Sequence, residues 1–340
     1  MKERIPYYDA IRGFAIILVV YCHVASVSLG ISEAIPSFNN IVGFIHLPIF
    51  FFLSGYLLFR PGRFDRWTEN GTFLKNKFLQ LVIPATIFLV LYALIFQRSF
   101  SSVLFSRFKG GYWFTYFLFV FNLLYLFLSW LLDKIGAERK APLIIFLLSI
   151  IVSAAPVALD IVYPQAPDDK FLQAISYQEY HFFQFFCFGA YLKSVNQCFE
   201  NMTKNKWMKA LIVLAPFILI ILHSFRIPGI DYPVTVLLSY SAVIMVFLLF
   251  KEWKGLATTR IGKVLCLIGR RSLDVYFIHF FLLPDLHGVG QYFYDNPNPV
   301  LEFLLSMCIA MAIVSVCLII GHLLRKSDFI AKLLFGRVDR

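Results

Sequence analysis

"DAIRGFAIILVVYCH", residues 9–23, places an acid and an arginine just before an apolar run and a histidine deep inside it. A helix that crosses a membrane needs about 20 mainly apolar residues. Ionisable side chains within such a helix are costly and usually face the interior of a helix bundle. A helix that served only as an anchor would carry none of the three. The stretch therefore predicts a first membrane helix that also contributes to chemistry.

The composition of the whole chain is that of a polytopic membrane protein. Hydrophobic residues make up 59% of the 340 positions and charged residues 15%, whereas an average soluble domain has about 25% charged residues. Lipid offers no partner to exposed backbone groups, so apolar runs of this length are expected to be helices. We predict an all-α bundle of about ten membrane helices, with approximate spans 8–28, 42–59, 76–97, 111–133, 141–163, 179–194, 207–225, 232–250, 269–286 and 299–324.

The basic residues predict the orientation of the chain. With the N-terminus inside, the inner segments hold 26 of the 31 Lys and Arg residues. Cytoplasmic loops generally carry this excess, so both termini are expected in the cytoplasm and the chain in the inner (plasma) membrane. The same rule explains the net charge of +11 without nucleic acid as a partner. The longest outer loop, 164–178, is too short to fold separately, so residues 1–340 are expected to form one membrane-embedded domain.

The six cysteines form neither a C-x-x-C pair nor a zinc-like spacing. Most lie inside apolar runs, where cysteine behaves as a small hydrophobic residue. We therefore expect no disulfide framework, no metal site and no bound cofactor.

Helix geometry brings the ionisable residues of the first span together. Arg12 and His23 are eleven residues apart, about three helical turns, so both side chains share one face. The histidine lies roughly 16 Å deeper than the arginine, near the middle of the membrane. Asp9 lies three residues before Arg12 and can pair with it at the cytoplasmic edge.

Two interpretations of these residues remain open. Asp9 and Arg12 could be an ion pair at the membrane edge, and His23 a buried histidine bonded to a neighbouring helix. Alternatively, the three are catalytic, with His23 as a general base, because histidine titrates near neutral pH. An arginine and a histidine on one face favour the catalytic interpretation.

The second candidate segment is "HLPIFFFLSGYLLFRPGRFDR", residues 46–66. The Ser-Gly pair at 54–55 predicts close helix packing. Several Arg and Lys residues follow, and they either determine the membrane topology or bind the phosphates of a cytoplasmic nucleotide donor. The candidate donor-binding residues among them are Arg60, Arg63, Lys75 and Lys77.

Candidate acceptor-binding residues lie in three later stretches. Trp113 and Tyr116 are either part of the aromatic belt at the membrane interface or a platform for a sugar ring. Glu179, at the outer end of the sixth span, is a possible acceptor contact. His279 enters the ninth span and is a candidate to line the same cavity.

The order of motifs resembles acyltransferase family 3, whose members are polytopic enzymes that O-acylate carbohydrates, mostly bacterial surface glycans. The resemblance covers essentially the whole chain. It rests on "DAIRGFAIILVVYCH", "IFFFLSGYLLFRPGR", "FLKNKFLQLVIP", "YWFTYFLF" and "IGRRSLDVYFIH".

The resemblance implies roles for individual residues. Arg12 and His23 match the family's essential pair on the first helix, and Arg60 and Arg63 match its Arg-x-x-Arg after the second apolar run. The implied donor is acyl-CoA, with acetyl-CoA as the default, bound from the cytoplasm as a co-substrate. The implied acceptor is a hydroxyl of a surface glycan or of its lipid-linked precursor.

Two further positions match the family and one departs from it. Trp113 matches an aromatic residue before the fourth helix, and His279 a histidine that commonly ends the Ser-Leu-x-x-Tyr motif. Asp274 stands where the family often has glycine. The chain also lacks the hydrolase-like extracytoplasmic domain of some relatives, so it is expected to complete the transfer alone or to hand its acyl group to another protein.

The implied mechanism begins with His23 taking the proton of the acceptor hydroxyl, after which the alkoxide attacks the thioester. Arg12, oriented by Asp9, neutralises developing charge or fixes the donor. A covalent acyl-histidine is an open variant. The alternatives are a transporter or flippase for a lipid-linked glycan, which would use the same charges for passage, and a non-catalytic membrane scaffold or sensor.

Overall fold

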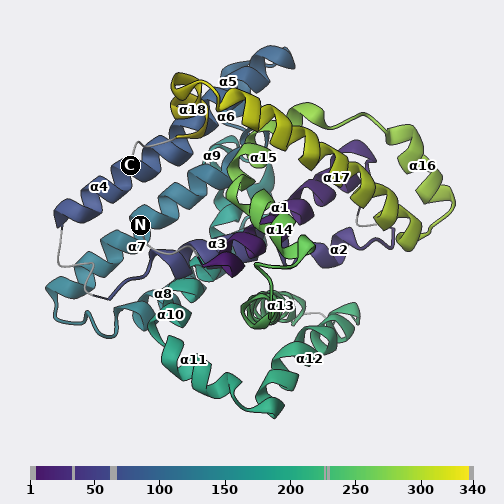
Figure 1. The fold of residues 1–340 in the computed structure, drawn as a ribbon. Helices are drawn as coiled ribbons and strands as arrows, with labels where there is room; N and C mark the ends of the chain where they lie inside the picture. The colour runs from purple at the N-terminus through teal and green to yellow at the C-terminus, as the bar shows by residue number, and fades with distance from the viewer. Residues whose placement is uncertain (1–4, 33–34, 62–66, 226, 228–229, 337–340) are drawn as a thin grey trace. The chain divides into compact units, whose positions relative to one another are not determined.

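The chain is mainly helical in a computed structural model, which describes residues 5–32, 35–61, 67–225, 227 and 230–336. The described residues form α-helices with short 3₁₀ and π turns and include no strand (Figure 1). The predicted all-α class is confirmed.

Eight helical segments of the described chain are long and apolar enough to cross a membrane. They are Pro6–Ser28, Asn39–Leu58, Glu69–Ile95, Trp113–Lys134, Ala141–Val162, Lys206–Ser224, Asp231–Glu252 and Pro299–Leu324. The two remaining predicted spans, 179–194 and 269–286, coincide with shorter helices. The number ten and the cytoplasmic placement of both ends stay predictions.

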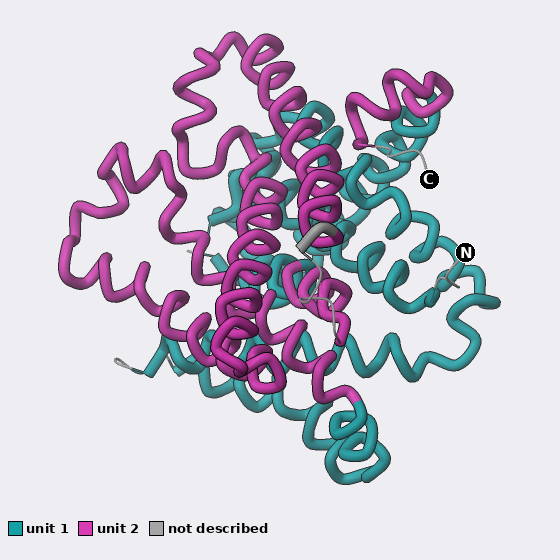
Figure 2. Tube along the Cα trace, turned by 90° about the vertical axis from the view of Figure 1, so that its left-hand side faces the viewer, with its two compact units in different colours: residues 1–50, 197–323 teal, residues 51–196, 324–340 magenta. Residues whose placement is uncertain are grey.

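The chain divides into two compact units (Figure 2). Unit 1 comprises residues 1–50 and 197–323, and unit 2 comprises residues 51–196 and 324–340, so the first division falls within α3 (His46–Leu58). The other elements of unit 1 are α1 (Pro6–His23), η1 (Val24–Ser28), α2 (Asn39–Val42), α11 (Asn196–Thr203), α12 (Lys206–Ser224), α13 (Asp231–Glu252), α14 (Arg260–Arg270), α15 (Ser272–Ile278), η6 (His279–Leu282), α16 (His287–Asp295) and α17 (Pro299–Leu324), except that the first residue of α11 and the last residue of α17 fall in unit 2.

Unit 2 holds the middle of the chain and its last helix. Its elements are α4 (Trp67–Lys77), η2 (Phe78–Val82), α5 (Ile83–Ile95), α6 (Phe100–Leu104), η3 (Lys109–Gly111), α7 (Trp113–Lys134), α8 (Ala141–Val162), η4 (Ala166–Asp168), α9 (Lys170–Ala174), η5 (Tyr177–Phe182), α10 (Phe183–Ser194) and α18 (Asp328–Phe335).

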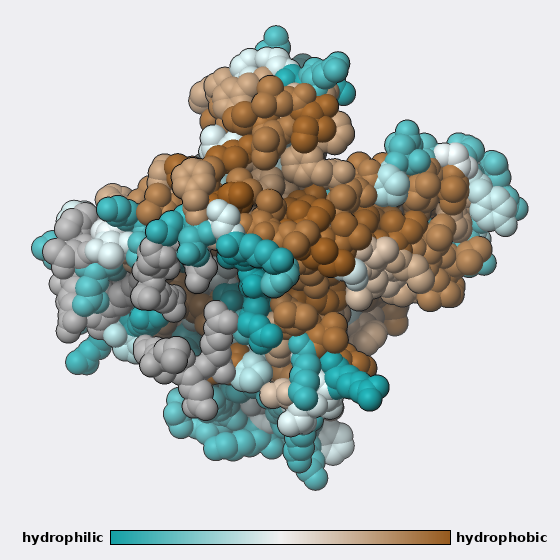
Figure 3. Space-filling model, turned by 45° about the horizontal axis from the view of Figure 1, so that its top comes forward, coloured by the Kyte–Doolittle hydropathy of each residue, from teal (hydrophilic) through white to brown (hydrophobic). Residues whose placement is uncertain are grey.

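Large apolar side chains cover much of the surface. Figure 3 shows hydrophobic residues in continuous areas of the visible face, with hydrophilic residues gathered in separate groups. Helix α12 is an extreme case, because its exposed side chains include Trp207, Leu211, Leu214, Phe217, Ile218 and Ile221. Exposed apolar surface of this extent is unfavourable in water and favourable in lipid. The surface therefore fits the membrane environment that the composition predicts.

In unit 1, α1 and α14 touch backbone to backbone at two glycines. A Cβ atom on Gly13 would lie 2.0 Å from the carbonyl oxygen of Leu265, and one on Gly269 would lie 1.7 Å from that of Asp9. Any side chain larger than hydrogen would push the two helices apart. Small residues at a contact are the usual means by which membrane helices approach this closely.

This contact aligns α1 in parallel with the α14–α15 segment. The thiol of Cys266 bonds the carbonyl of Pro6 at 3.3 Å, Gly269 lies against Gly13, and residue numbers rise together along both segments. Ten residues beyond Gly13 and Gly269 lie His23 and His279. The glycine contact thus sets the register in which the two histidines meet.

Unit 2 has an equivalent contact between α3 and α10. A Cβ on Gly55 would lie 1.8 Å from the carbonyl oxygen of Phe186, and one on Gly189 would lie 1.9 Å from that of Phe52. The close packing predicted from the Ser-Gly pair at 54–55 is therefore present in the structure.

Replacement of Gly269 by alanine is expected to destabilise the chain. The added methyl group would overlap the backbone of α1, and such overpacking costs about 1–3 kcal/mol. The measurement is the midpoint of thermal unfolding of the purified chain in detergent. Gly288→Ala is the matched control, because a Cβ there meets nothing within 4 Å. Equal midpoints for the two variants would contradict the close contact.

Candidate functional site

Two histidines from distant parts of the sequence are joined in unit 1. The Nδ1 atom of His23 lies 2.9 Å from the Nε2 atom of His279. Their ring planes are 19° apart and their centroids 5.0 Å apart. Since the nitrogens are much closer than the centroids, the rings meet edge to edge, nearly in one plane. This is the arrangement of a hydrogen bond along a nitrogen lone pair rather than of face-to-face stacking.

Both histidines lie where a regular helix ends. His23 is the last residue of α1, and the π turn η1 follows it directly. His279 is the first residue of the 3₁₀ turn η6, directly after α15. π turns within helices often occur at functional sites. The changes from α-helix to the turns η1 and η6 therefore place each histidine ring at the end of its α-helix.

The two rings differ in burial and in their other partners. His279 is 0% exposed, whereas His23 is partly exposed. The Nδ1 atom of His279 lies 3.0 Å from the carbonyl oxygen of Val275 and 2.8 Å from that of Tyr276. Within the described part of the chain, the ring of His23 forms no hydrogen bond besides the one to His279. The ring of Phe280 packs against His23, with centroids 4.7 Å apart.

The ion pair predicted on the first helix is present. The Arg12 guanidinium lies 3.6 Å from the Asp9 carboxylate, with the arginine partly exposed and the aspartate largely buried. Because α1 is regular from Pro6 to His23, Arg12 and His23 share one face, as the spacing predicts.

A third histidine near this pair was not singled out from the sequence. His46 lies 3.9 Å from the thiol of Cys22, measured from its Nδ1 atom, and this nitrogen also donates to the carbonyl of Val42 at 3.0 Å. No spacing in the sequence relates His46 to the first helix. The only signal was its place at the start of the stretch 46–66.

The predicted donor-binding residues lie in unit 2. Arg60 and Lys75 are exposed, and Lys77 is partly exposed with its ammonium 5.6 Å from the centre of the Phe73 ring. Arg63 lies outside the described residues. The exposure of Arg60 and Lys75 leaves their charges accessible to an anion.

Two of the predicted acceptor-binding residues pack inside unit 2. Trp113 is buried, and its ring stacks on Phe182 with centroids 5.7 Å apart. The hydroxyl of Tyr116 lies 3.0 Å from that of Thr86. These contacts give both residues a part in the packing of unit 2, and their predicted acceptor contact stays a prediction.

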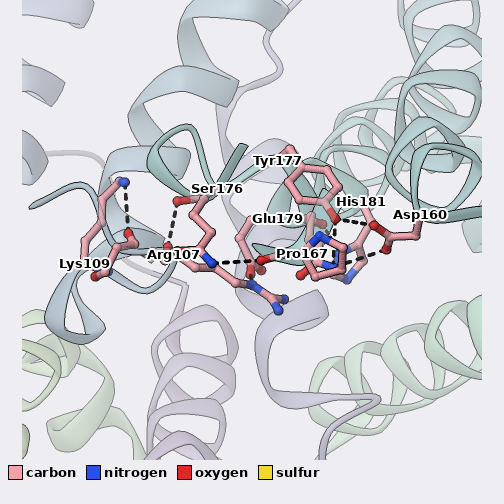
Figure 4. A network of polar contacts seen from close by, with 11 residues as sticks. Arg107, Lys109, Asp160, Pro167, Ser176, Tyr177, Glu179 and His181 are labelled. Atoms are coloured by element: carbon pink, nitrogen blue, oxygen red, sulfur yellow. Dashed lines mark hydrogen bonds and ion pairs between the residues drawn. The ribbon is translucent and has the colours of Figure 1, made fainter. Parts of the chain in front are cut away.

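Glu179 is part of a polar network between two connecting segments of unit 2 (Figure 4). Its side chain is 3% exposed and accepts a hydrogen bond at 2.9 Å from Nε of Arg107, whose side chain is 39% exposed. The hydroxyl of Ser176 donates to the Arg107 carbonyl at 2.7 Å. The network thus ties residues 106–109 to residues 174–179.

Lys109 supports the same connection. Its ammonium donates to the carbonyl oxygens of Leu104 and Ala174, at 3.1 and 2.8 Å. Burial lowers the pKa of Lys109, because desolvation disfavours the charged form. On the other side of Glu179, the hydroxyl of Tyr177 donates to the carboxylate of Asp160.

Among the described residues, no group of three or more His, Cys, Asp or Glu side chains is arranged to hold a metal ion. All six cysteines are free thiols.

Comparison with known proteins yields one match. A family model described as an acyltransferase domain matches residues 5–320, which include both helices that carry the histidine pair. No match was found among curated proteins or among solved structures.

Replacement of Arg107 by alanine is expected to destabilise the chain, because it leaves the buried Glu179 carboxylate without its cation. The expected cost is about 1–3 kcal/mol, less than for a fully buried pair because Arg107 is partly exposed. The measurement is the thermal unfolding midpoint in detergent, with exposed Arg98→Ala as the matched control.

A second substitution tests the cause of that loss. Arg107→Ala combined with Glu179→Gln is expected to recover most of the stability, since a neutral amide needs no cation. A double variant as unstable as Arg107→Ala alone would show that the loss does not come from the stranded carboxylate.

Proposed function

Since the chain belongs to acyltransferase family 3 and is therefore a membrane acyltransferase, we propose that it moves an acyl group from acyl-CoA to a carbohydrate hydroxyl. Acetyl-CoA is the proposed donor. The proposed acceptor is a surface glycan or its lipid-linked precursor. The observation that carries the proposal is the partly exposed His23 ring, held at Nδ1 by His279.

His23 acts as the general base. It takes the proton from the acceptor hydroxyl, and the resulting alkoxide oxygen attacks the carbonyl carbon of the thioester. A C–O bond forms as the C–S bond breaks. The departing CoA thiolate takes the proton back from His23, which returns the ring to its neutral state. Direct attack of His23 on the thioester, through an acyl-histidine, is the variant of this scheme.

Arg12 supplies positive charge on the same face of α1. Its guanidinium lies roughly 16 Å along the helix from His23, too far to contact the reacting carbonyl, so it holds the donor, and Asp9 restricts its position through the ion pair. An arginine suits this task, since its charge persists at any working pH.

The donor phosphates are held by Arg60, Arg63, Lys75 and Lys77. The exposure of Arg60 and Lys75 supports this proposal. Trp113, Tyr116 and Glu179 remain the proposed acceptor contacts.

Replacement of His23 by alanine is expected to abolish acyl transfer without unfolding the chain, because the base is lost while the helix is retained. The measurement is CoA release from radiolabelled acetyl-CoA by the purified chain in nanodiscs, with and without a crude surface-glycan extract. General base catalysis contributes about 10²–10⁴-fold, so at least this loss is expected.

The matched control is His322→Ala, because this histidine is exposed near the end of α17. Its turnover is expected to equal that of the wild type. A folded wild type that turns over none of a panel of acyl-CoAs would contradict the proposal in favour of a transporter. Full activity in His23→Ala would show that His23 is not the general base.

A separate experiment tests whether the basic residues bind the phosphates of the donor. Arg60→Ala combined with Lys75→Ala is expected to raise KM for acetyl-CoA about tenfold with little change in kcat, because the lost interactions bind the donor equally before and during the reaction. Lys134→Ala combined with Arg139→Ala, both exposed, is the matched control of charge. An unchanged KM for acetyl-CoA would show that Arg60 and Lys75 do not bind the donor phosphates.

A further inference from the structure

The hydrogen bonds of His279 determine which of its nitrogens carries the proton. Its Nδ1 atom faces two carbonyl oxygens, of Val275 and Tyr276, at 3.0 and 2.8 Å. A carbonyl oxygen can only accept, so Nδ1 of His279 must be the donor. A neutral imidazole carries one proton, and Nε2 of His279 is therefore the acceptor.

The same reasoning then applies to His23. Its Nδ1 atom lies 2.9 Å from that acceptor nitrogen and must donate to it. The remaining nitrogen of a neutral His23, Nε2, is then unprotonated. In the opposite assignment, Nδ1 of His279 would present a lone pair to two carbonyl oxygens, which is repulsive.

We propose that His279 is a positioning residue that holds His23 in the Nδ1–H tautomer and so presents its Nε2 atom as the base. The inference rests on the proposed function for its catalytic meaning. The assignment of the tautomer is independent of the proposed function, because it follows from the hydrogen bonds alone.

Burial supports this division of roles. His279 is 0% exposed, whereas the ring of His23 is partly exposed and its Nε2 atom forms no hydrogen bond within the described residues. His279 is therefore enclosed by the protein, whereas part of His23 is not covered by the described residues. These facts favour a role for His279 behind His23 over the substrate contact expected from the sequence.

The arrangement also favours the charged intermediate. When Nε2 of His23 takes the acceptor proton, its Nδ1–H continues to donate to His279, whose own N–H continues to donate to the last turn of α15. The free carbonyls at the C-terminal end of a helix carry partial negative charge, which stabilises a nearby cation. No hydrogen bond has to be rearranged during the proton transfer.

The first test is independent of activity. The full chain is labelled with ¹⁵N-histidine in lipid bilayers, and the His23 signals are identified by their absence in His23→Gln. Solid-state NMR of the neutral ring is expected to show a protonated Nδ1 and an unprotonated Nε2. Protonation at Nε2 with a bare Nδ1 would overturn the inference whatever the chain catalyses.

Variants of His279 test the cause. In His279→Leu the acceptor is lost, so the proton of His23 is expected to distribute over both nitrogens. In His279→Gln the side-chain oxygen can accept the same bond, so the Nδ1–H form is expected to be largely retained. Equal tautomer populations in the wild type and His279→Leu would overturn the inference.

Kinetics supply the second test. His279→Leu is expected to lower kcat about 10²-fold, with KM for acetyl-CoA and for the glycan extract unchanged, and His279→Gln is expected to recover much of this loss. His322→Gln is the matched control. A raised KM with unchanged kcat would instead indicate a substrate contact. A wild-type chain without any acyl transfer would refute the proposed function. The NMR experiment would still test the tautomer of His23.

Discussion

The backbones of α1 and α14 touch directly, and this contact sets how the two histidine-bearing segments of unit 1 lie against each other. Gly13 and Gly269 leave no room for a side chain, so the two helices approach closely where these residues face each other. The segments then continue in parallel, and ten residues later each presents a histidine. A shift along the helix axes would separate the two rings, so the glycines determine the chemistry of residues that they do not touch.

In the histidine pair, His23 takes the position of a base and His279 that of the residue that orients it. One ring is accessible and the other is fully buried, and the buried ring is held by carbonyls at the end of its own helix. Partners that hold one nitrogen of a histidine determine which nitrogen is available for catalysis. Here the orienting group is a neutral imidazole. It therefore avoids the cost of burying another full charge within a membrane bundle.

Unit 2 shows how polar residues of connecting segments serve the fold. Glu179, a candidate acceptor contact, is buried against Arg107, and Lys109 ties the same segments through backbone carbonyls. A buried carboxylate needs such a partner, because desolvation of an unpaired charge costs several kcal/mol. The ion pair gives Glu179 a part in the packing of unit 2, and its contact with an acceptor stays a proposal.

The helical class, the apolar runs and the Asp9–Arg12 pair could all be predicted from the residues, because each depends on composition or on spacing within one helix. The sequence also indicated close packing at Gly55, since a small residue in a Phe-rich helix has few other uses. It could not show that His279 meets His23, that Gly269 meets Gly13, or that His46 lies beside Cys22. Helical periodicity relates residues within a segment, whereas contacts between segments follow from register. That register is visible only in the folded chain, and the proposed assignment of the unprotonated nitrogen of His23 depends on it.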